Sequence, residues 1–253
     1  MSSKVYLVGS GPGGTGLLTQ RAADIIEKAD VIFFDQLPGE EILSTLPKKA
    51  EKIDCGKYGK NHTLEQRDIE DLMVDRARKN LVVVRLKGGD PFLFGRGGEE
   101  IETLRAAGIA VEMVPGVTSA LAVPASAGIP VTHRKYASQV TILTGHEDPT
   151  KPESALDWKL LAQGRGTIVI LMGVANLRNI ARALMENGKA GETPVAVIER
   201  GLRKDRRVTT GPLATIGDVA VQAGVKPPAV IVIGDVVRLY DPKQPDLIPY
   251  EGE

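Results

Sequence analysis

The stretch VVVRLKGGDPFLFGRGGEE, residues 82–100, carries a strand pattern, a loop and the start of a helix in direct succession. Its largely apolar run at 82–86 is typical of a strand that is covered on both faces. Paired glycines and Asp90 follow, and a helical pattern then runs from about residue 98 to residue 107 and ends at Gly108, a common C-cap residue. This order of strand, glycine-rich loop and helix predicts an α/β fold, in which ligands bind at the carboxyl ends of the strands.

The same alternation continues along the rest of the chain. Short apolar runs that predict strands cover residues 5–8, 31–34, 52–54, 111–114, 140–143, 167–171, 195–198 and 230–233. Helical patterns separate most of them, for example at 176–186, before Gly188. Residues 128–135 interrupt the alternation with glycine, proline and charge. We therefore expect two α/β domains, 1–135 and 136–253, each with a mixed, mainly parallel sheet flanked by helices.

The composition excludes several classes of protein. The 253 residues carry 32 Lys and Arg against 32 Asp and Glu, so the formal net charge is zero, which disfavours nucleic-acid and membrane-surface partners. The single cysteine, Cys55, excludes an internal disulfide, and the scattered histidines lack the spacing of metal ligands, so no metal is expected. A signal-peptide pattern and an apolar run of about 18 residues are both missing, which predicts a cytoplasmic protein.

The first glycine loop, Gly9-Ser-Gly-Pro-Gly-Gly14, fits the dinucleotide-binding fingerprint literally. That fingerprint requires a helix to begin at once, so that its amide groups meet a pyrophosphate. Here Pro12 removes one amide, and we expect the helix to begin only at about Thr19. The loop alone leaves three alternatives: a structural corner, a nicotinamide-dependent oxidoreductase and a non-catalytic nucleotide-binding module.

The second glycine loop carries more charge than a structural turn requires. Asp90 is an acceptor at the carboxyl end of its strand, and Arg96 and Glu99 stand one helical turn apart at the start of the next helix. Arg85 and Lys87 add two cations beside the loop. Cations can therefore gather near this loop even though the total charge of the chain is zero.

Several motifs together resemble the tetrapyrrole methylase family. They are Gly9-x-Gly11-Pro-Gly with Leu17-Leu-Thr19, Val-Arg-Leu-Lys-Gly-Gly-Asp-Pro at 84–91, Phe-Gly-Arg-Gly-Gly-Glu-Glu at 94–100, Val-Pro-Gly-Val-Thr-Ser-Ala at 114–120 and Ala-Gly-Ile-Pro-Val-Thr-His-Arg at 127–134. The second and third motifs are similar to those of the members that methylate uroporphyrinogen III. The resemblance implies a two-domain tetrapyrrole methylase fold with the active site in the cleft between the domains, and a homodimer.

The resemblance also implies that S-adenosyl-L-methionine (SAM) is the methyl donor and S-adenosyl-L-homocysteine its product. The cofactor contacts that it implies are Pro12, Gly88, Gly89, Asp90, Leu93, Thr118, Ser119, Met172, Gly201 and Ala229. Asp90 or nearby carbonyls would accept from the ammonium of SAM, and backbone groups beside Met172, Gly201 and Ala229 would contact the adenosine. Taken singly, Met172 and Ala229 are ordinary core residues, and Thr118-Ser119 is an ordinary helix N-cap.

The activity that the resemblance implies adds two methyl groups to uroporphyrinogen III and gives precorrin-2 (dihydrosirohydrochlorin), for sirohaem and cobalamin-type tetrapyrroles. A sulfonium donor needs alignment more than a nucleophile, and the proton that leaves the macrocycle needs an acid/base pair. Asp35 and Lys57 match the proton acceptor and the proton donor of the family. Without the resemblance, Asp35 is a turn acceptor at a strand end and Lys57 a solvated loop cation.

The substrate carries eight carboxylates, for which the bidentate guanidinium of arginine is suited. We therefore assign Arg96 and Arg134 to substrate binding, and Glu99 to the pyrrole N–H groups. Residues 14–16 replace an acidic residue and a proline that the family often has, and Ser126 stands where an aromatic is common. These departures leave open a related SAM-dependent precorrin or cobalt-precorrin methyltransferase.

Overall fold

The computed structural model of the chain describes residues 4–58, 61–62, 66–146, 155–243 and 247, with the backbone alone at 57–58 and 61–62. The chain forms two compact units, Met1–Thr118 (unit 1) and Ser119–Glu253 (unit 2). The predicted ranges, 1–135 and 136–253, separate the same two sheets and differ from these units only in residues 119–135. The position of that domain boundary stays a prediction.

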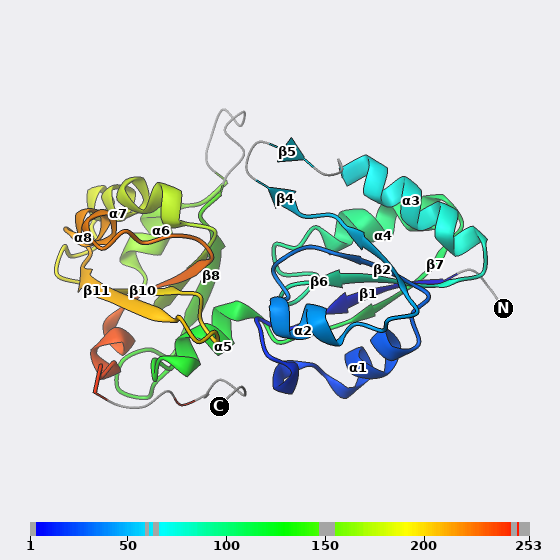
Figure 1. The fold of residues 1–253 in the computed structure, drawn as a ribbon. Helices are drawn as coiled ribbons and strands as arrows, with labels where there is room; N and C mark the ends of the chain where they lie inside the picture. The colour runs from blue at the N-terminus through cyan, green and yellow to red at the C-terminus, as the bar shows by residue number, and fades with distance from the viewer. Residues whose placement is uncertain (1–3, 59–60, 63–65, 147–154, 244–246, 248–253) are drawn as a thin grey trace. The chain divides into compact units, whose positions relative to one another are not determined.

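Unit 1 is built on a five-stranded sheet in the order β3-β2-β6-β1-β7, in which all neighbouring strands are parallel (Figure 1). Its strands are β1 (Lys4–Gly9), β2 (Val31–Phe34), β3 (Glu51–Asp54), β6 (Val82–Lys87) and β7 (Ala110–Val114), as the apolar runs predicted. The short antiparallel strands β4 (Lys57–Tyr58) and β5 (Asn61–His62) follow β3. Because parallel strands end at the same edge of a sheet, the five carboxyl ends of the larger sheet lie along one edge.

Helices cover both faces of this sheet. They are α1 (Gln20–Glu27) and α2 (Glu40–Thr45) on one face, and α3 (Gln66–Arg78) and α4 (Gly97–Ala106) on the other (Figure 1). Successive side chains of a strand point to opposite faces, so neighbours in sequence join different cores. Val8 and Ile32 pack with α1 and α2, whereas Leu7 and Phe33 pack with α3 and α4. This three-layer arrangement confirms the predicted α/β class.

The predicted helix limits are also confirmed. α1 begins after Thr19, whose hydroxyl oxygen accepts from the backbone N–H of Ala22 at 3.1 Å, and one 3-10 turn, η1 (Thr15–Leu17), precedes it. Gly108 lies beyond the end of α4 with φ +76°, and Gly188 beyond the end of α7 (Leu177–Glu186) with φ +102°. Both glycines adopt the left-handed conformation that commonly ends a helix.

Unit 2 contains a mixed sheet in the order β11-β10-β12-β9-β8. Its strands are β8 (Val140–Thr144), β9 (Thr167–Leu171), β10 (Pro194–Glu199), β11 (Arg207–Pro212) and β12 (Ala229–Ile233). Only β8 and β9 pair in parallel, whereas the other three pairs are antiparallel. The expectation of a mainly parallel sheet is therefore wrong for this unit, because apolar runs reveal strands but not their directions.

Helices α6 (Trp158–Gln163), α7 and α8 (Ile216–Gln222) pack against the sheet of unit 2 and form one hydrophobic core with it. Helix α5 (Ser119–Ser126) contacts β9 and β12. Leu184 of α7 and Ile216 of α8 are fully buried there against Val197 of β10. Each unit therefore has a hydrophobic core of its own, as expected for two domains.

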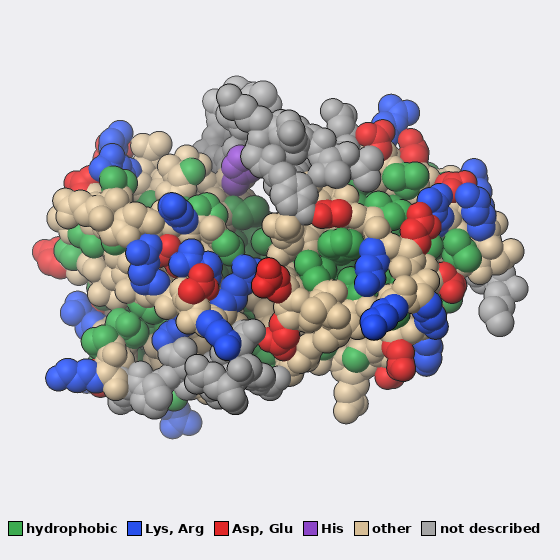
Figure 2. Space-filling model, in the orientation of Figure 1, with side chains coloured by type: hydrophobic (Ala, Val, Ile, Leu, Met, Phe, Trp, Pro, Cys, Tyr) green, Lys and Arg blue, Asp and Glu red, His purple; other side chains and the backbone are tan. Residues whose placement is uncertain are grey.

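The described surface carries both signs of charge. On the face shown in Figure 2, Lys and Arg are interspersed with Asp and Glu rather than gathered into one large patch. Among the described residues, no helix is long and apolar enough to cross a membrane, and no group of three or more His, Cys, Asp or Glu could hold a metal ion.

Candidate active site

Four loops meet where the parallel strands of unit 1 end. They follow β1, β2, β6 and β7 and comprise residues 10–14, 35–39, 88–95 and 115–118, which together are named the carboxyl edge (Figure 1). Most of the residues predicted for unit 1 lie in these loops, among them Pro12, Asp35, Asp90 and Thr118. The topology of the sheet thus collects predicted site residues that are up to about a hundred positions apart in the sequence.

Glycines lock three of these loops together through the backbone. The N–H of Gly89 donates to the carbonyl of Gly11 at 2.7 Å, and the N–H of Gly11 donates back to the carbonyl of Gly89 at 3.2 Å. A Cβ added to Gly116 would overlap the carbonyl oxygen of Gly89, and one added to Gly9 would lie 2.6 Å from the nitrogen of Gly116. Gly88 likewise has no room for a side chain, because Leu37 packs on it. These glycines are required for the close approach of the loops.

Asp90 fastens the β6 loop to the β7 loop. Its Oδ1 accepts from the backbone N–H of Phe92 at 2.9 Å, and its Oδ2 accepts from the N–H of Gly116 at 3.2 Å. A carboxylate has about four lone-pair sites, so both oxygens keep capacity for a further donor. Leu93, one residue after Phe92, is half-buried in the same loop.

The predicted proton acceptor lies at the carboxyl edge. Asp35 directly follows β2, it is half-buried, and its Oδ1 accepts from the backbone N–H of Leu37 at 2.9 Å. This contact is the turn-acceptor role that a strand-end aspartate often has, and it leaves Oδ2 for other contacts. Lys57 lies in β4, but its side chain falls outside the described residues, so the acid/base pair stays a prediction.

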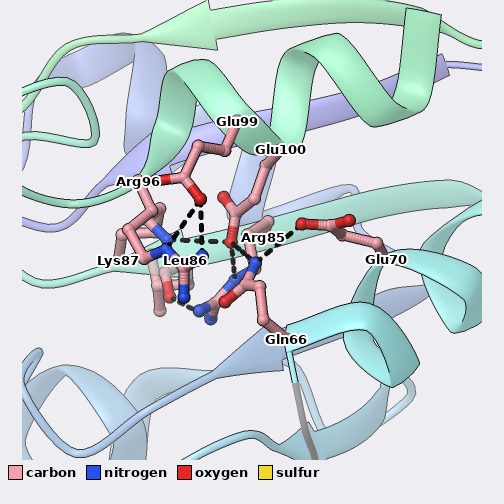
Figure 3. Close-up of polar contacts among 8 residues, drawn as sticks. All are labelled: Gln66, Glu70, Arg85, Leu86, Lys87, Arg96, Glu99 and Glu100. Atoms are coloured by element: carbon pink, nitrogen blue, oxygen red, sulfur yellow. Dashed lines mark hydrogen bonds and ion pairs between the residues drawn. The ribbon is translucent and has the colours of Figure 1, made fainter. Parts of the chain in front are cut away.

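The two substrate-binding residues predicted in α4 bind one another. Arg96 has a left-handed backbone (φ +58°) at the N-cap position of α4, and its Nε donates to Glu99 Oε2 at 3.0 Å (Figure 3). Both side chains are exposed. The guanidinium lowers the pKa of Glu99, and the carboxylate raises the pKa of Arg96. A carboxylate ligand would therefore compete with Glu99 for Arg96.

Arg85 and Lys87 lie beside the loop, as the sequence indicated, but they are buried. They are 5% and 6% exposed, and both donate to Oε1 of Glu100, which is 0% exposed, at 3.1 and 2.9 Å (Figure 3). We name these three residues the buried charge cluster. They are buried because both cations point to the face of β6 that α4 covers, where the carboxylate of Glu100 meets them.

Three predicted cofactor residues of unit 2 lie along one edge of its sheet. Met172 follows β9, Gly201 follows β10 by two residues, and Ala229 begins β12. Because β12 runs antiparallel to both β9 and β10, its first residues lie opposite the last residues of those strands. The side chain of Met172 is 52% exposed and its φ is +56°. Val123 packs so closely on Gly201 that no Cβ fits there.

The remaining predicted residues occupy turns and a helix start. Thr118 is the last residue of unit 1, and Ser119 is the first residue of α5, so the pair does lie at a helix N-terminus. Arg134 is exposed in unit 2, in a turn closed by the N–H of His133, which donates to the carbonyl of Ala137 at 2.8 Å.

The two departures from the family pattern have local explanations. The N–H and the hydroxyl of Thr15 both donate to Oε1 of Glu41, at 2.7 and 2.9 Å, so a carboxylate from α2 holds the glycine loop. Ser126 is 1% exposed, and its hydroxyl donates to the carbonyl of Val123 at 2.8 Å, which makes it part of the packing of α5.

Comparison with known protein families identifies the class of enzyme to which these loops belong. The model of the family described as tetrapyrrole (corrin/porphyrin) methylases matches residues 4–217. The chain belongs to the tetrapyrrole methylase family. The nicotinamide-dependent and non-catalytic interpretations of the first glycine loop are therefore set aside.

Relatives within the family point to one branch of it. The chain is 60% identical to the S-adenosyl-L-methionine-dependent uroporphyrinogen III methyltransferase of Methanosarcina barkeri, over 94% of this chain and 93% of that protein. The structure of uroporphyrin-III C-methyltransferase from Thermus thermophilus in complex with S-adenyl homocysteine has a TM-score of 0.79 and 36% identity, and the match covers 93% of this chain and 94% of that one. A cobalt precorrin-4 methyltransferase has a TM-score of 0.83 with only 25% identity, covering 93% and 96%. Fold similarity alone thus does not separate the substrates named for these relatives, whereas the sequence identity to the enzymes named for uroporphyrinogen III is higher.

Proposed function

We propose that this chain is a SAM-dependent C-methyltransferase that methylates uroporphyrinogen III twice and gives precorrin-2. The observation that carries the proposal is the 60% identity to the Methanosarcina barkeri enzyme over nearly the whole of both chains. The arrangement of the carboxyl edge supports it, since Asp35, Asp90 and the glycine loops belong to one edge of one sheet.

We assign the predicted cofactor residues to the two ends of SAM. The methionine end is assigned to residues of unit 1, where Asp90 keeps acceptor capacity for an ammonium, and to the first residue of unit 2. These residues are Pro12, Gly88, Gly89, Asp90, Leu93 and Thr118 in unit 1, and Ser119 in unit 2. In unit 2 the adenosine end is assigned to Met172, Gly201 and Ala229, which share one sheet edge. Bound SAM supplies a methyl group that is already activated on a sulfonium. The protein therefore has to orient its ligands rather than provide a nucleophile.

The side chains of this chain provide charge and proton transfer. Asp35 accepts the proton that leaves the macrocycle, and Lys57 returns one. Arg96 and Arg134 bind carboxylates of the substrate. When a substrate carboxylate binds Arg96, it replaces Glu99 as the partner of the guanidinium. The carboxylate of Glu99 can then accept hydrogen bonds from the pyrrole N–H groups.

A second candidate function is methylation of a later precorrin or cobalt-precorrin. The high structural similarity to the cobalt precorrin-4 methyltransferase is the observation that favours it. Anaerobic incubation of the purified protein with SAM and uroporphyrinogen III separates the two candidates. A gain of two methyl masses supports the proposal, whereas turnover of a pre-methylated corrinoid alone supports the second candidate.

Two further predictions are a homodimer, which the resemblance implies, and action in the cytoplasm, which the missing signal-peptide pattern predicts. Light scattering coupled to size-exclusion chromatography tests the first, since a dimer has twice the 27.0 kDa of one chain. Fractionation of cells that express the tagged protein tests the second.

A further inference from the structure

The exposed apolar side chains of unit 1 gather at the carboxyl edge. Among the described residues of this unit, the large hydrophobic side chains that are exposed are Leu37, Phe92, Phe94 and Val117. All four belong to the loops of this edge. Single exposed apolar residues are common on protein surfaces and need no explanation. Their confinement to one group of loops indicates a surface that contacts an apolar ligand.

Two of the four phenylalanines of the chain lie in the loop between β6 and α4 (Figure 1). Phe92 is 53% exposed and Phe94 is 41% exposed. The other two, Phe33 and Phe34, lie in β2 and pack in the cores of unit 1. A packed aromatic side chain buries about 150–250 Å², so the two exposed rings contribute little of this burial to folding. Stability of the fold therefore does not explain why these two residues are aromatic.

The turn that carries the two rings is held tightly by its own backbone. The N–H of Gly97 donates to the carbonyl of Pro91 at 3.1 Å. A Cβ added to Gly95 or to Gly97 would lie 2.7 or 2.6 Å from the carbonyl oxygen of Pro91. The inside of the turn thus has no room for a side chain, and the ring of Phe94 remains outside it, where a ligand can meet it.

Phe94 occupies a backbone conformation that disfavours it. Its φ is +55°, and Arg96, two residues further on, has a φ of +58°. This left-handed region is uncommon for bulky residues, whereas glycine and asparagine adopt it readily. Bulky residues in such conformations cluster at ligand-binding sites. Both side chains are exposed, so contact with a ligand explains their presence better than packing does.

The charge beside the rings indicates which ligand this is. The turn presents Phe92 and Phe94 together with the exposed guanidinium of Arg96. A tetrapyrrole has the complementary arrangement, because its ring of pyrroles is apolar and its carboxylates lie around the periphery. SAM carries a positive sulfonium, which a neighbouring guanidinium disfavours. The macrocycle therefore fits this surface better than the methyl donor does.

We propose that Phe92 and Phe94 form the surface against which the macrocycle of the substrate packs, while Arg96 binds one of its carboxylates. The inference rests on the proposed function, because the macrocycle is that of uroporphyrinogen III. Leu37 extends the surface from the neighbouring β2 loop, where it packs on Gly88 and stays exposed. These side chains bind and orient the macrocycle by burial of apolar surface and take no part in proton transfer.

The first test measures binding without turnover. The probe is uroporphyrin III, the oxidised macrocycle with the same carboxylates, titrated into the SAM-free protein in a calorimeter at several temperatures. We expect a negative heat-capacity change for the wild type, since burial of apolar surface produces one. Phe94→Asn should raise the Kd about tenfold and make the heat-capacity change less negative. An unchanged Kd in Phe94→Asn would overturn the proposed contact.

Asparagine is the chosen replacement because it tolerates the left-handed backbone, so that the turn is kept. The midpoint of urea denaturation should therefore not fall in Phe94→Asn. A lower midpoint would give the ring a structural role and overturn the proposal. Phe94→Tyr, which keeps an aromatic face, should recover most of the affinity. Leu160→Asn is the matched control, because Leu160 is an exposed apolar residue of α6 in unit 2, and it should change neither the Kd nor the midpoint.

The second test follows the reaction and examines other occupants of the surface. Phe94→Asn should raise KM for uroporphyrinogen III about tenfold and keep the salt dependence of the wild type, because no charge is lost. An equal rise in the Kd for S-adenosylhomocysteine would mean that the rings contact the cofactor. A dimer that dissociates in Phe94→Asn would mean that a second copy of the chain covers them. Either result would overturn the proposal.

The outcomes separate this inference from the proposed function. Turnover of uroporphyrinogen III by the wild type, with an unchanged KM in Phe94→Asn, overturns the role of Phe94 alone. Absence of turnover by the wild type overturns the proposed function. The Kd for uroporphyrin III then still decides whether Phe94 contacts a macrocycle, since that measurement needs no turnover.

Discussion

At the scale of single residues, the pairing of Arg96 with Glu99 determines what a substrate carboxylate has to displace. The pair is exposed, with Arg96 Nε 3.0 Å from Glu99 Oε2, and exposed pairs contribute only about 0–1 kcal/mol. A bidentate carboxylate of the substrate can therefore replace Glu99. We expect Arg96→Ala to raise KM for uroporphyrinogen III about tenfold, while the Kd for S-adenosylhomocysteine measured by calorimetry changes less than about twofold.

Arg105→Ala is the control for that substitution, since Arg105 is an exposed arginine in the last turn of the same helix. It should leave both constants unchanged. Equal losses of affinity for both ligands in Arg96→Ala would contradict the assignment of Arg96 to the substrate.

Cys55 offers a second prediction at this scale. Its side chain is 6% exposed, and burial, opposed by Arg85, raises the pKa of its thiol to about 11. Since only the thiolate reacts, roughly a thousandth of the thiol is reactive at pH 8. We expect iodoacetamide to leave the folded protein unmodified at that pH and to alkylate one site in urea, as mass spectrometry would show. Equal rates of alkylation in the folded protein and in urea would refute the raised pKa of the Cys55 thiol.

At the scale of elements, the backbone contacts among the glycine loops make the carboxyl edge intolerant of side chains. A Cβ at position 116 would overlap the carbonyl of Gly89, which has no side-chain freedom to yield. Overpacking of this kind costs about 1–3 kcal/mol, so Gly116→Ala should lower the free energy of unfolding by that amount and weaken SAM binding.

Gly98→Ala is the comparison within the same unit. Nothing lies within 4 Å of a Cβ added to Gly98, which is in the first turn of α4, and alanine favours the helix by about 0.5–1 kcal/mol. Urea denaturation should show the two substitutions acting in opposite directions. If Gly116→Ala left the free energy of unfolding unchanged, the loops that carry Gly89 and Gly116 would be able to separate without cost.

The sequence predicted the carboxyl edge because strand ends are recognisable and parallel strands end together. It did not reveal β11, because that strand reads Arg-Val-Thr-Thr-Gly-Pro and lies at the edge of its sheet, where an apolar run is not required. It also did not reveal that Arg85 and Lys87 are buried on Glu100, since that depends on which face α4 covers. The contacts made by loops and side chains across elements could be found only in the structure.

At the scale of the whole molecule, the net charge is zero, so the total charge gives no long-range attraction for an anionic substrate, and on the face shown in Figure 2 the described residues carry charges of both signs. Attraction must then come from a few arginines at short range. Salt screens such exposed contacts over about 10 Å at 0.1 M. We expect KM for uroporphyrinogen III to rise as salt increases from 0.05 to about 0.5 M, while the Kd for S-adenosylhomocysteine, a zwitterion, changes little.

Arg96→Ala, which removes a local cation, should make the KM for uroporphyrinogen III depend less on the salt concentration. In Arg96→Ala the KM is already raised, and salt then has one contact fewer to screen, whereas Arg105→Ala should keep the slope of the wild type. Steady-state kinetics over the salt series measures both slopes. A slope that Arg96→Ala leaves unchanged would place the charge that attracts the substrate elsewhere on the molecule, with Arg134 the next residue to test.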